Sequence, residues 1–446
     1  MADVTGEVTE LITELIRNAC VNDGTVESGQ EVRNVETLRA CLDGTGMDFE
    51  IYESEPGRQS MVARIEGSDP DAPSLMLMGH TDVVPANPDR WQRDPFGGEV
   101  VDGVVWGRGA VDMLNLTSSM AVAMRRLADS GFTPNGDLVY LGVADEEAGG
   151  RWGAKWLVEN EPDAVRTDWV VTEFGGPRIP MSPPDAPALP VAVAEKGAFW
   201  GTMRITGTPG HGSMPFRSDN ALATAAEAVR RIWSYRPPAA IGEVWQRFVD
   251  GLSLPDELRT ALVEPAALDA ALESIDDVGL ARFIHACTHE TIAPNVMHAG
   301  VKTNVIPDTA VVDLDIRTLP GTDEGAVREL LADALGDLSD RVEIEFWTAD
   351  VASASPLDTP LWDAMQRLVT DFIPGGRNIP CIVPGATDSR FLRGLGATCH
   401  GYGVYSDRVS FADFMGMFHG DDERIDQESL RLSTEFWIAL ARDLLS

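Results

Sequence analysis

The sequence predicts an α/β protein in which a mixed, mostly parallel sheet forms one domain and a smaller α/β domain is inserted into it. Short apolar runs bounded by turn residues alternate with amphipathic helical stretches, the pattern of buried strands in a parallel sheet. A later segment has the order β-α-β-β-α-β, which is the signature of a ferredoxin-like unit. The length of 446 residues also exceeds one ordinary domain. We therefore expect a first domain built from residues 1–194 and 351–446, with residues 195–350 inserted between its two parts.

The elements of the first domain follow from the spacing of its apolar residues. Helical spacing predicts helices at residues 5–20, 32–42, 115–130, 360–372 and 427–445, and compact apolar runs predict strands at residues 49–52, 60–65, 75–78, 137–144 and 169–172. Residues 87–111 are rich in Gly, Pro and Asp with little periodicity, and we expect one long loop there. Loops of this length are uncommon unless they are functional.

The inserted segment changes pattern at Gly197. Its predicted elements are a half-exposed strand at 197–206, a helix at 221–233, an irregular and helix-prone stretch at 237–290, strands at 292–299 and 310–317, a helix at 323–335 and a strand at 342–347. Without the helix-prone stretch, these elements give the ferredoxin-like order.

Composition excludes several classes of partner. With 71 acidic and 35 basic residues, the formal charge of −36 argues against nucleic acid and anionic membranes. The sequence has no run of about twenty apolar residues, so we expect no membrane span. The N-terminus carries several acidic residues before Arg17, unlike a signal peptide. The five cysteines form no CxxC pair, which indicates reduced thiols, a cytoplasmic protein and no cysteine-based zinc site.

The run from Ser74 to Asp82 is the centre of the predicted chemistry. Its apolar part ends at Gly79, and His80 and Asp82 follow on the same side of an extended backbone. In open α/β sheets, ligands bind beyond the carboxyl ends of the strands. An imidazole can bind a metal through one nitrogen while a neighbouring carboxylate orients the ring through the other. We therefore interpret His80 as a metal ligand.

Carboxylates follow other predicted strands in the same way. Glu146 and Glu147 follow the strand at 137–144, and Glu173 follows the strand at 169–172. Consecutive carboxylates at a strand end indicate either a solvated loop or a cation site. Asp112 lies between the long loop and a helix, where an acidic residue can be a metal ligand or a helix N-cap. His419 is a second exposed histidine just before the last helix.

Brought together, these residues would form a metal site made only of nitrogen and oxygen ligands. The candidate ligands are His80, Asp112, Glu147, Glu173 and His419. Imidazole with carboxylate suits zinc, with cobalt or manganese as substitutes. Two ions would need a bridging carboxylate. Asp112 suits the bridge, with His80 and Glu173 on one ion and Glu147 and His419 on the other, and Glu146 suits the general base.

At this point the sequence resembles a known family, the zinc metallopeptidases that include aminoacylase, glutamate carboxypeptidase, acetylornithine deacetylase and succinyl-diaminopimelate desuccinylase. The resemblance covers nearly the whole chain and depends on four segments: residues 79–85 (GHTDVVP), 107–113 (GRGAVDM), 145–147 (DEE) and 419–423 (HGDDE). It implies the same five ligands for two zinc ions, with Glu146 as the base and Asp82 supporting a ligand. It also implies a zinc-exopeptidase-like catalytic domain, an inserted lid that often dimerises, and a cis peptide after Asp112.

The resemblance assigns further residues in and around the lid. In this family, the histidine matching His211 in Gly-His-Gly-Ser polarises the scissile carbonyl, often across a dimer. Asn304 and Arg317 match positions that hold the substrate's carboxylate, and Arg390 lies in a loop with a similar role. Arginine suits this role through bidentate geometry, although a surface ion pair is the alternative. Outside the family pattern, a histidine between glycines is more often a turn residue.

These observations lead to one functional hypothesis. We expect a hydrolase with two zinc ions that cleaves the amide bond of N-acyl amino acids or of short peptides with a free carboxylate. Glu173, where the family's dipeptidases tend to have Asp, favours this substrate class. The alternatives are a desuccinylase or deacetylase of amino-acid biosynthesis and a non-catalytic binding relative. A homodimer through the lid is expected from the family, although the stretch at 237–290 could replace the partner's contribution.

Overall fold

Nine strands form the central sheet of the protein, whose computed structural model describes residues 3–183 and 185–446. The strand order is β1-β2-β6-β3-β7-β17-β8-β15, with β16 beside β8. The centre of the sheet, β6-β3-β7-β17, is parallel, whereas β1 and β2 are antiparallel additions at one edge. The α/β class with a mixed, mostly parallel sheet is thereby confirmed. The strands are β1 (Asp48–Glu55), β2 (Arg58–Ile65), β3 (Leu75–His80), β6 (Leu138–Val143), β7 (Trp169–Thr172), β8 (Ala188–Glu195), β15 (Ser353–Ala354), β16 (Arg377–Val383) and β17 (Thr398–Gly401).

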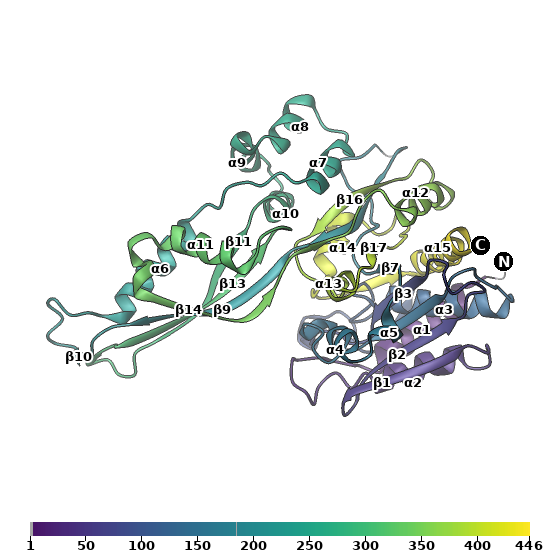
Figure 1. Ribbon diagram of the computed structural model, residues 1–446, viewed down its shortest axis with the longest axis horizontal. Coiled ribbons are helices and arrows are strands. Elements are labelled where there is room, and N and C mark those ends of the chain that lie inside the picture. Colours follow the sequence, from purple (N-terminus) through teal and green to yellow (C-terminus); the bar gives the residue numbers. More distant parts are fainter. Residues whose placement is uncertain (1–2, 184) are drawn as a thin grey trace.

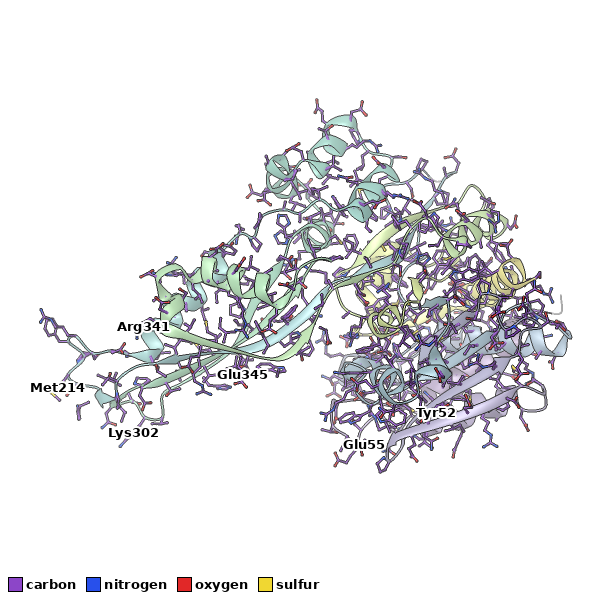
Figure 2. The ribbon with its side chains drawn as sticks, viewed as in Figure 1. Tyr52, Glu55, Met214, Lys302, Arg341 and Glu345 are labelled. Atoms are coloured by element: carbon purple, nitrogen blue, oxygen red, sulfur yellow. The ribbon has the colours of Figure 1, made fainter. Side chains whose placement is uncertain are left out.

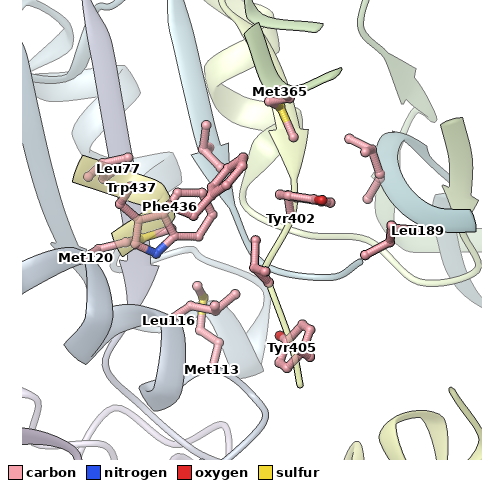
Figure 3. Packing of buried hydrophobic residues seen from close by; sticks show 14 of the residues in the cluster. Leu77, Met113, Leu116, Met120, Leu189, Met365, Tyr402, Tyr405, Phe436 and Trp437 are labelled. Atoms are coloured by element: carbon pink, nitrogen blue, oxygen red, sulfur yellow. The ribbon is translucent and has the colours of Figure 1, made fainter. Parts of the chain in front are cut away.

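Helices cover both faces of this sheet, which explains why its central strands are apolar throughout. Along β3, Leu75 and Leu77 face one core while Met76 and Met78 face the other. The first core is completed by α1 (Thr5–Arg17), α2 (Val32–Leu42), α3 (Leu114–Asp129), α12 (Pro360–Phe372) and α15 (Gln427–Leu445), and the second by α4 (Ala154–Asn160), α5 (Pro162–Val165) and α13 (Ser389–Gly394). Figure 3 shows Trp437 of α15 packed beside Met120 of α3 and Leu77 of β3.

A second, four-stranded sheet extends away from the first as an arm (Figure 1). Its order is β11-β13-β9-β14, and all neighbours are antiparallel. One face packs on the helices α6 (Ala221–Ser234) and α11 (Glu324–Leu335). The chain order is therefore β-α-β-β-α-β. The strands are β9 (Gly197–Thr206), β11 (Thr291–Ala299), β13 (Thr309–Thr318) and β14 (Val342–Asp350), and the short strands β10 (Gly210–His211) and β12 (Val305–Ile306) lie at the far end of the arm.

The helix-prone stretch between α6 and β11 forms four helices that pack against the central sheet. They are α7 (Glu243–Asp250), α8 (Asp256–Val263), α9 (Pro265–Glu273) and α10 (Val278–Thr288). Trp245 and Phe248 of α7 share the first core with Ile379 of β16. The chain therefore leaves the arm after α6, covers part of the main body, and returns to the arm at β11. The division at residues 194 and 350 stays a prediction.

The expected loop at 87–111 is in part wrong. It contains a 3-10 turn (Pro88–Arg90) and two short strands, β4 (Glu99–Val101) and β5 (Val104–Trp106). These strands form a three-stranded sheet with β18 (Arg424–Asp426). A strand from the C-terminal region therefore fixes the loop, a pairing that local periodicity does not show. The remaining helix is α14 (Phe411–Met417), and within residues 3–183 and 185–446 no helix is long and apolar enough to cross a membrane.

Candidate metal centre

His80 is the last residue of β3 and is 1% exposed. A Cβ atom at the preceding Gly79 would lie 2.5 Å from Thr117 Oγ1, so only glycine lets β3 approach α3 this closely. Thr117 Oγ1 in turn donates a hydrogen bond to the His80 carbonyl oxygen at 2.7 Å. His80 Nδ1 donates to the backbone carbonyl of Asp82 at 2.9 Å, and the Asp82 carboxylate lies farther away, at 3.5 Å. The ring is thereby fixed with Nε2 directed at the Asp112 carboxylate, the side on which a metal would bind.

Asp112 lies between the two candidate histidine ligands. Its Oδ1 is 3.2 Å from His80 Nε2, and its Oδ2 is 3.3 Å from His419 Nε2. The carboxylate does not cap α3, because the N-cap residue is Met113 and makes no side-chain cap hydrogen bond. The peptide between Asp112 and Met113 is cis, as the resemblance implies. Asp112 therefore has the position of a bridging ligand.

Glu173 and Glu147 complete two groups of three residues around Asp112. Glu173 Oε2 is 3.8 Å from His80 Nε2, and Glu147 Oε2 is 3.0 Å from His419 Nε2. Within each group, all candidate ligand atoms lie within 4.8 Å of one another. The side chain of His419 is 59% exposed while that of His80 is buried, so the site opens to solvent at His419.

Three of the ligand-bearing turns contain a non-glycine residue with positive φ. Asp145 (φ +69°) directly precedes Glu146 and Glu147, Phe174 (φ +68°) directly follows Glu173, and His419 itself has φ +55°. Such conformations cost of order 1–3 kcal/mol each and persist where the surroundings enforce them. The backbone therefore turns sharply where each of these carboxylates and the imidazole enter the site.

Asp82 holds the turn that carries Glu146 and Glu147. Its carboxylate accepts hydrogen bonds from the backbone N–H groups of Glu146 at 3.3 Å and Glu147 at 3.2 Å, and from Asn22 Nδ2 at 2.8 Å. The side chain of Asp82 is fully buried. Asp82 thus connects the end of β3 to the turn after β6.

The electrostatics of the cluster favour a cation. Burial raises the pKa of Glu146 well above its usual value, and the negative charge of Glu173 adds to the effect. Burial, together with the charge of Asp112, raises the pKa of Glu147 to about 7. Hydrogen bonds to Asp112 and Glu147 raise the pKa of His419 to about 10. Several buried carboxylates repel one another here, and a bound cation would relieve this repulsion.

The donor set fits divalent metal ions. Two imidazole nitrogens and carboxylate oxygens suit zinc, and also cobalt or manganese. Glu147 Oε1 is buried and accepts no hydrogen bond from the described residues, which leaves it free to bind an ion. The candidate ligands therefore lie together, and Glu146 lies directly beside one of them in the chain.

Glu423 is a site residue that the sequence did not single out. Its buried carboxylate accepts hydrogen bonds from the backbone N–H groups of Gly109, Val111 and Asp112 at 2.6–2.9 Å, and from Arg108 Nη1 at 2.8 Å. It thereby fixes the loop that carries Asp112. The signal was its place four residues after His419 in the closing motif.

The predicted lid residues do not lie with the metal ligands. His211 is exposed on β10 at the far end of the arm, where the Asn304 carbonyl accepts from the Gly212 N–H at 2.8 Å. Figure 2 shows the neighbouring Met214 and Lys302 at this tip, away from the main body. Arg317, on β13, donates to Asp315 Oδ1 at 2.7 Å and lies over the Trp200 ring.

Arg390 lies near the catalytic turn but points at backbone atoms. Its guanidinium donates to the carbonyl of Thr387 at 2.5 Å and to that of Gly149 at 2.9 Å. Gly149 follows Glu146 and Glu147 in the same turn. These contacts join the loop of Thr387 to the turn that contains Gly149. The role of Arg390 in binding substrate stays a prediction.

Comparisons with known proteins identify the family of the chain. The model of peptidase family M20/M25/M40 matches residues 76–443. The N-fatty-acyl-amino acid synthase/hydrolase PM20D1 of Xenopus tropicalis is 29% identical over 442 residues, covering 94% of this chain and 83% of that protein. Human aminoacylase-1 is 26% identical over 409 residues, covering 90% of this chain and 87% of that protein.

A solved structure has the same fold. The M20 family metallo-carboxypeptidase Sso-CP2 from Sulfolobus solfataricus superposes with a TM-score of 0.70 at 18% identity, covering 98% of this chain and 99% of that chain. The family match spans most of the chain and includes the strands and loops that carry the candidate metal ligands. The protein is a metal-dependent hydrolase of amide bonds and belongs to peptidase family M20/M25/M40.

Proposed function

We propose that the protein is a hydrolase with two zinc ions that releases amino acids from N-acyl amino acids or from short peptides with a free carboxylate. The observation that carries the proposal is the shared carboxylate of Asp112 between two groups of metal ligands, with Glu146 beside them. The names of two relatives, an N-fatty-acyl-amino acid hydrolase and an aminoacylase, support this substrate class. A desuccinylase or deacetylase would use the same site on another acyl group.

The residues of the chain suggest how the reaction proceeds. Bound zinc would supply the positive charge that acidifies an attacking water and polarises the scissile carbonyl. Glu146 accepts the proton from that water and passes it to the leaving amine. The Asp82 carboxylate holds the turn by accepting a hydrogen bond from the backbone N–H of Glu146. The backbone carbonyl of Asp82 orients the His80 ring. A non-catalytic relative is disfavoured because the base and all five ligands are present.

His211 and Asn304 can act only if the tip of the arm reaches a metal centre, either that of the same chain or that of a second copy. The tip exposes the large apolar side chains of Met214 (69%) and Phe216 (83%). Contiguous exposed apolar surface marks protein–protein contacts, and such a contact at the tip would cover these side chains. We propose a homodimer in which the tip of one copy supplies His211 to the other. The imidazole would then stabilise the negative charge that develops on the carbonyl oxygen.

The test of the function is metal analysis together with an assay of amine release. Purified protein is loaded with zinc and offered N-acetyl, N-succinyl and long-chain N-acyl amino acids and dipeptides, with and without a chelator. About two zinc ions per chain and chelator-sensitive hydrolysis are expected. Hydrolysis that survives complete removal of metal, or a zinc-loaded protein inactive on every substrate, would contradict the proposal.

Arg317→Ala tests the recognition of the substrate's carboxylate. Loss of a charge-assisted hydrogen bond of about 1.5–3 kcal/mol should raise KM roughly 10- to 100-fold for substrates with a free carboxylate. The matched control is Arg341→Ala, which removes another half-exposed arginine of the arm, paired with Asp219 at 2.7 Å. Steady-state kinetics on free and carboxyl-amidated substrates decides the role. An equal rise in KM for free and carboxyl-amidated substrates would show that Arg317 does not recognise the carboxylate.

A further inference from the structure

Arg58 is a completely buried cation behind the metal centre. It is the first residue of β2 and lies at the edge of the sheet where β6 ends in the turn of Glu146 and Glu147. Its Nη2 contacts the Asp145 carboxylate, its Nη1 donates to the Ser28 carbonyl at 2.6 Å, and its guanidinium lies 5.4 Å from the Trp152 ring. Arginine is almost never fully buried unless it is paired. The contacts with Asp145 and Ser28 therefore stabilise Arg58 in this buried position.

The local backbone is shaped to admit this guanidinium. A Cβ atom at Gly29 would lie 2.0 Å from Arg58 Nη1, and Gly29 has φ +74°, a conformation that suits glycine. Glu31 also lies 3.4 Å from Arg58, but its oxygens accept no hydrogen bond from the described residues. Asp145 is therefore the principal anionic partner of Arg58.

Asp145 connects Arg58 to the catalytic turn. It directly precedes Glu146 and has a positive φ of +69°. Its Oδ2 accepts from the backbone N–H of Trp152 at 2.8 Å, and its Oδ1 accepts from Asn22 Nδ2 at 3.0 Å. Both carboxylate oxygens are thus held, which fixes the direction in which the chain enters the turn.

Asn22 joins the same group to Asp82. Its Nδ2 donates to Asp145 and, at 2.8 Å, to Asp82 Oδ2. One amide group therefore lies between two buried carboxylates and holds both in place. The guanidinium of Arg58 contacts the Asp145 carboxylate of this pair and is itself fully buried.

We propose that Arg58 is a positioning residue of the active site: its guanidinium holds Asp145 and, through Asn22, Asp82, so that Glu147 and His80 keep the spacing that binds metal and Glu146 keeps its place as base. The inference rests on the proposed metal centre. It predicts that Arg58 affects zinc affinity and kcat although it contacts neither metal nor substrate.

Three variants test this role. Arg58→Met removes the charge, Arg58→Lys restores it without the forked geometry, and Arg64→Met is the matched control. Arg64 lies on the same strand and pairs with Asp137 at 2.5 Å, at the opposite end of β2 from the metal ligands. Zinc affinity is measured by competition with a chromophoric chelator, kcat and KM by steady-state kinetics, and folding by thermal melting of the protein without metal.

Residues that orient metal ligands typically change affinity about 10- to 100-fold when replaced. We therefore expect Arg58→Met to weaken zinc binding and to lower kcat by about that factor, with KM within about threefold of the wild-type value. Arg58→Lys should recover part of both losses, and Arg64→Met should change zinc affinity and kcat less than about twofold. A lower melting temperature for Arg58→Met with unchanged zinc affinity and kcat would overturn the proposal.

If Arg58→Met fails to fold, Asn22→Ala carries the test, because it removes the link to Asp82 without removing a charge. Its control is Asn378→Ala on β16. This change removes a buried hydrogen bond that Asn378 accepts from the Tyr402 hydroxyl at 2.8 Å. We expect only Asn22→Ala to weaken zinc binding; equal zinc affinities would overturn the proposal. Zinc affinity is measured without a substrate. A protein that binds zinc but hydrolyses nothing would therefore contradict the proposed function and leave the test of Arg58 intact.

Discussion

Glu146→Gln should lower kcat by roughly 10²- to 10⁴-fold while the protein keeps its full complement of zinc, because a general base contributes about that factor. Glutamine has the shape of glutamate but cannot accept a proton from water. The backbone N–H of residue 146 still donates to Asp82, so the turn keeps its position. The measurement pairs single-turnover kinetics on the best substrate with zinc analysis of the same sample.

The control for this prediction is Glu159→Gln, the same change at an exposed position on α4. It should leave both zinc content and kcat unchanged. If Glu146→Gln instead released metal in proportion to its loss of activity, Glu146 would be a metal ligand, and the assignment of Glu147 would have to be revised. Full activity in Glu146→Gln would show that another group accepts the proton.

Asp112→Asn should remove both zinc ions together. Asp112 is the only residue that belongs to both groups of candidate ligands within the described chain, and each of its oxygens faces a different imidazole. Because ions about 3.5–4 Å apart repel each other, the loss of the bridging charge should bring zinc from about two per chain to below one. Hydrolysis should fall with it, below the level of Glu146→Gln.

Asp421→Asn is the control for this change. Asp421 lies two residues from His419 and pairs with Arg90 at 2.9 Å on the surface. Zinc titration followed calorimetrically would show two sites in the control and in the wild type. If Asp112→Asn lost only one zinc ion and kept the other at unchanged affinity, Asp112 would serve one ion alone and the two sites would be independent.

The grouping of the candidate metal ligands could be predicted in part because several of their signals are local. His80, Glu147 and Glu173 follow apolar runs that the structure shows as β3, β6 and β7, and parallel strands bring their carboxyl ends to one edge. Asp82 was singled out beside His80, but most of the contacts that hold the candidate ligands gave no such signal. Asn22 and Asp145 are 123 positions apart, and Glu423 and Val111 are 312 apart, so only the folded chain shows that they meet.

Two of the strands that sequence reasoning missed share a different feature. Neither β8 nor β16 was predicted, and each contains a proline, Pro190 and Pro380. Proline cannot donate a ladder hydrogen bond, so it argues against an interior strand. Here the two strands pair with each other in parallel, with Pro190 opposite Ile379 and Pro380 opposite Val191. Tertiary packing therefore overrode the local preference.

The helices α7 to α10 also change how the arm is attached to the main body. An inserted domain ordinarily has two covalent connections, but here the chain crosses four times: after β8, after α6, before β11 and after β14. Two crossings would leave the arm free to bend and to twist about a narrow neck. With four crossings, a rotation of the arm must displace four connecting segments rather than two. The tip can therefore follow fewer paths toward a metal centre than an arm with two connections could.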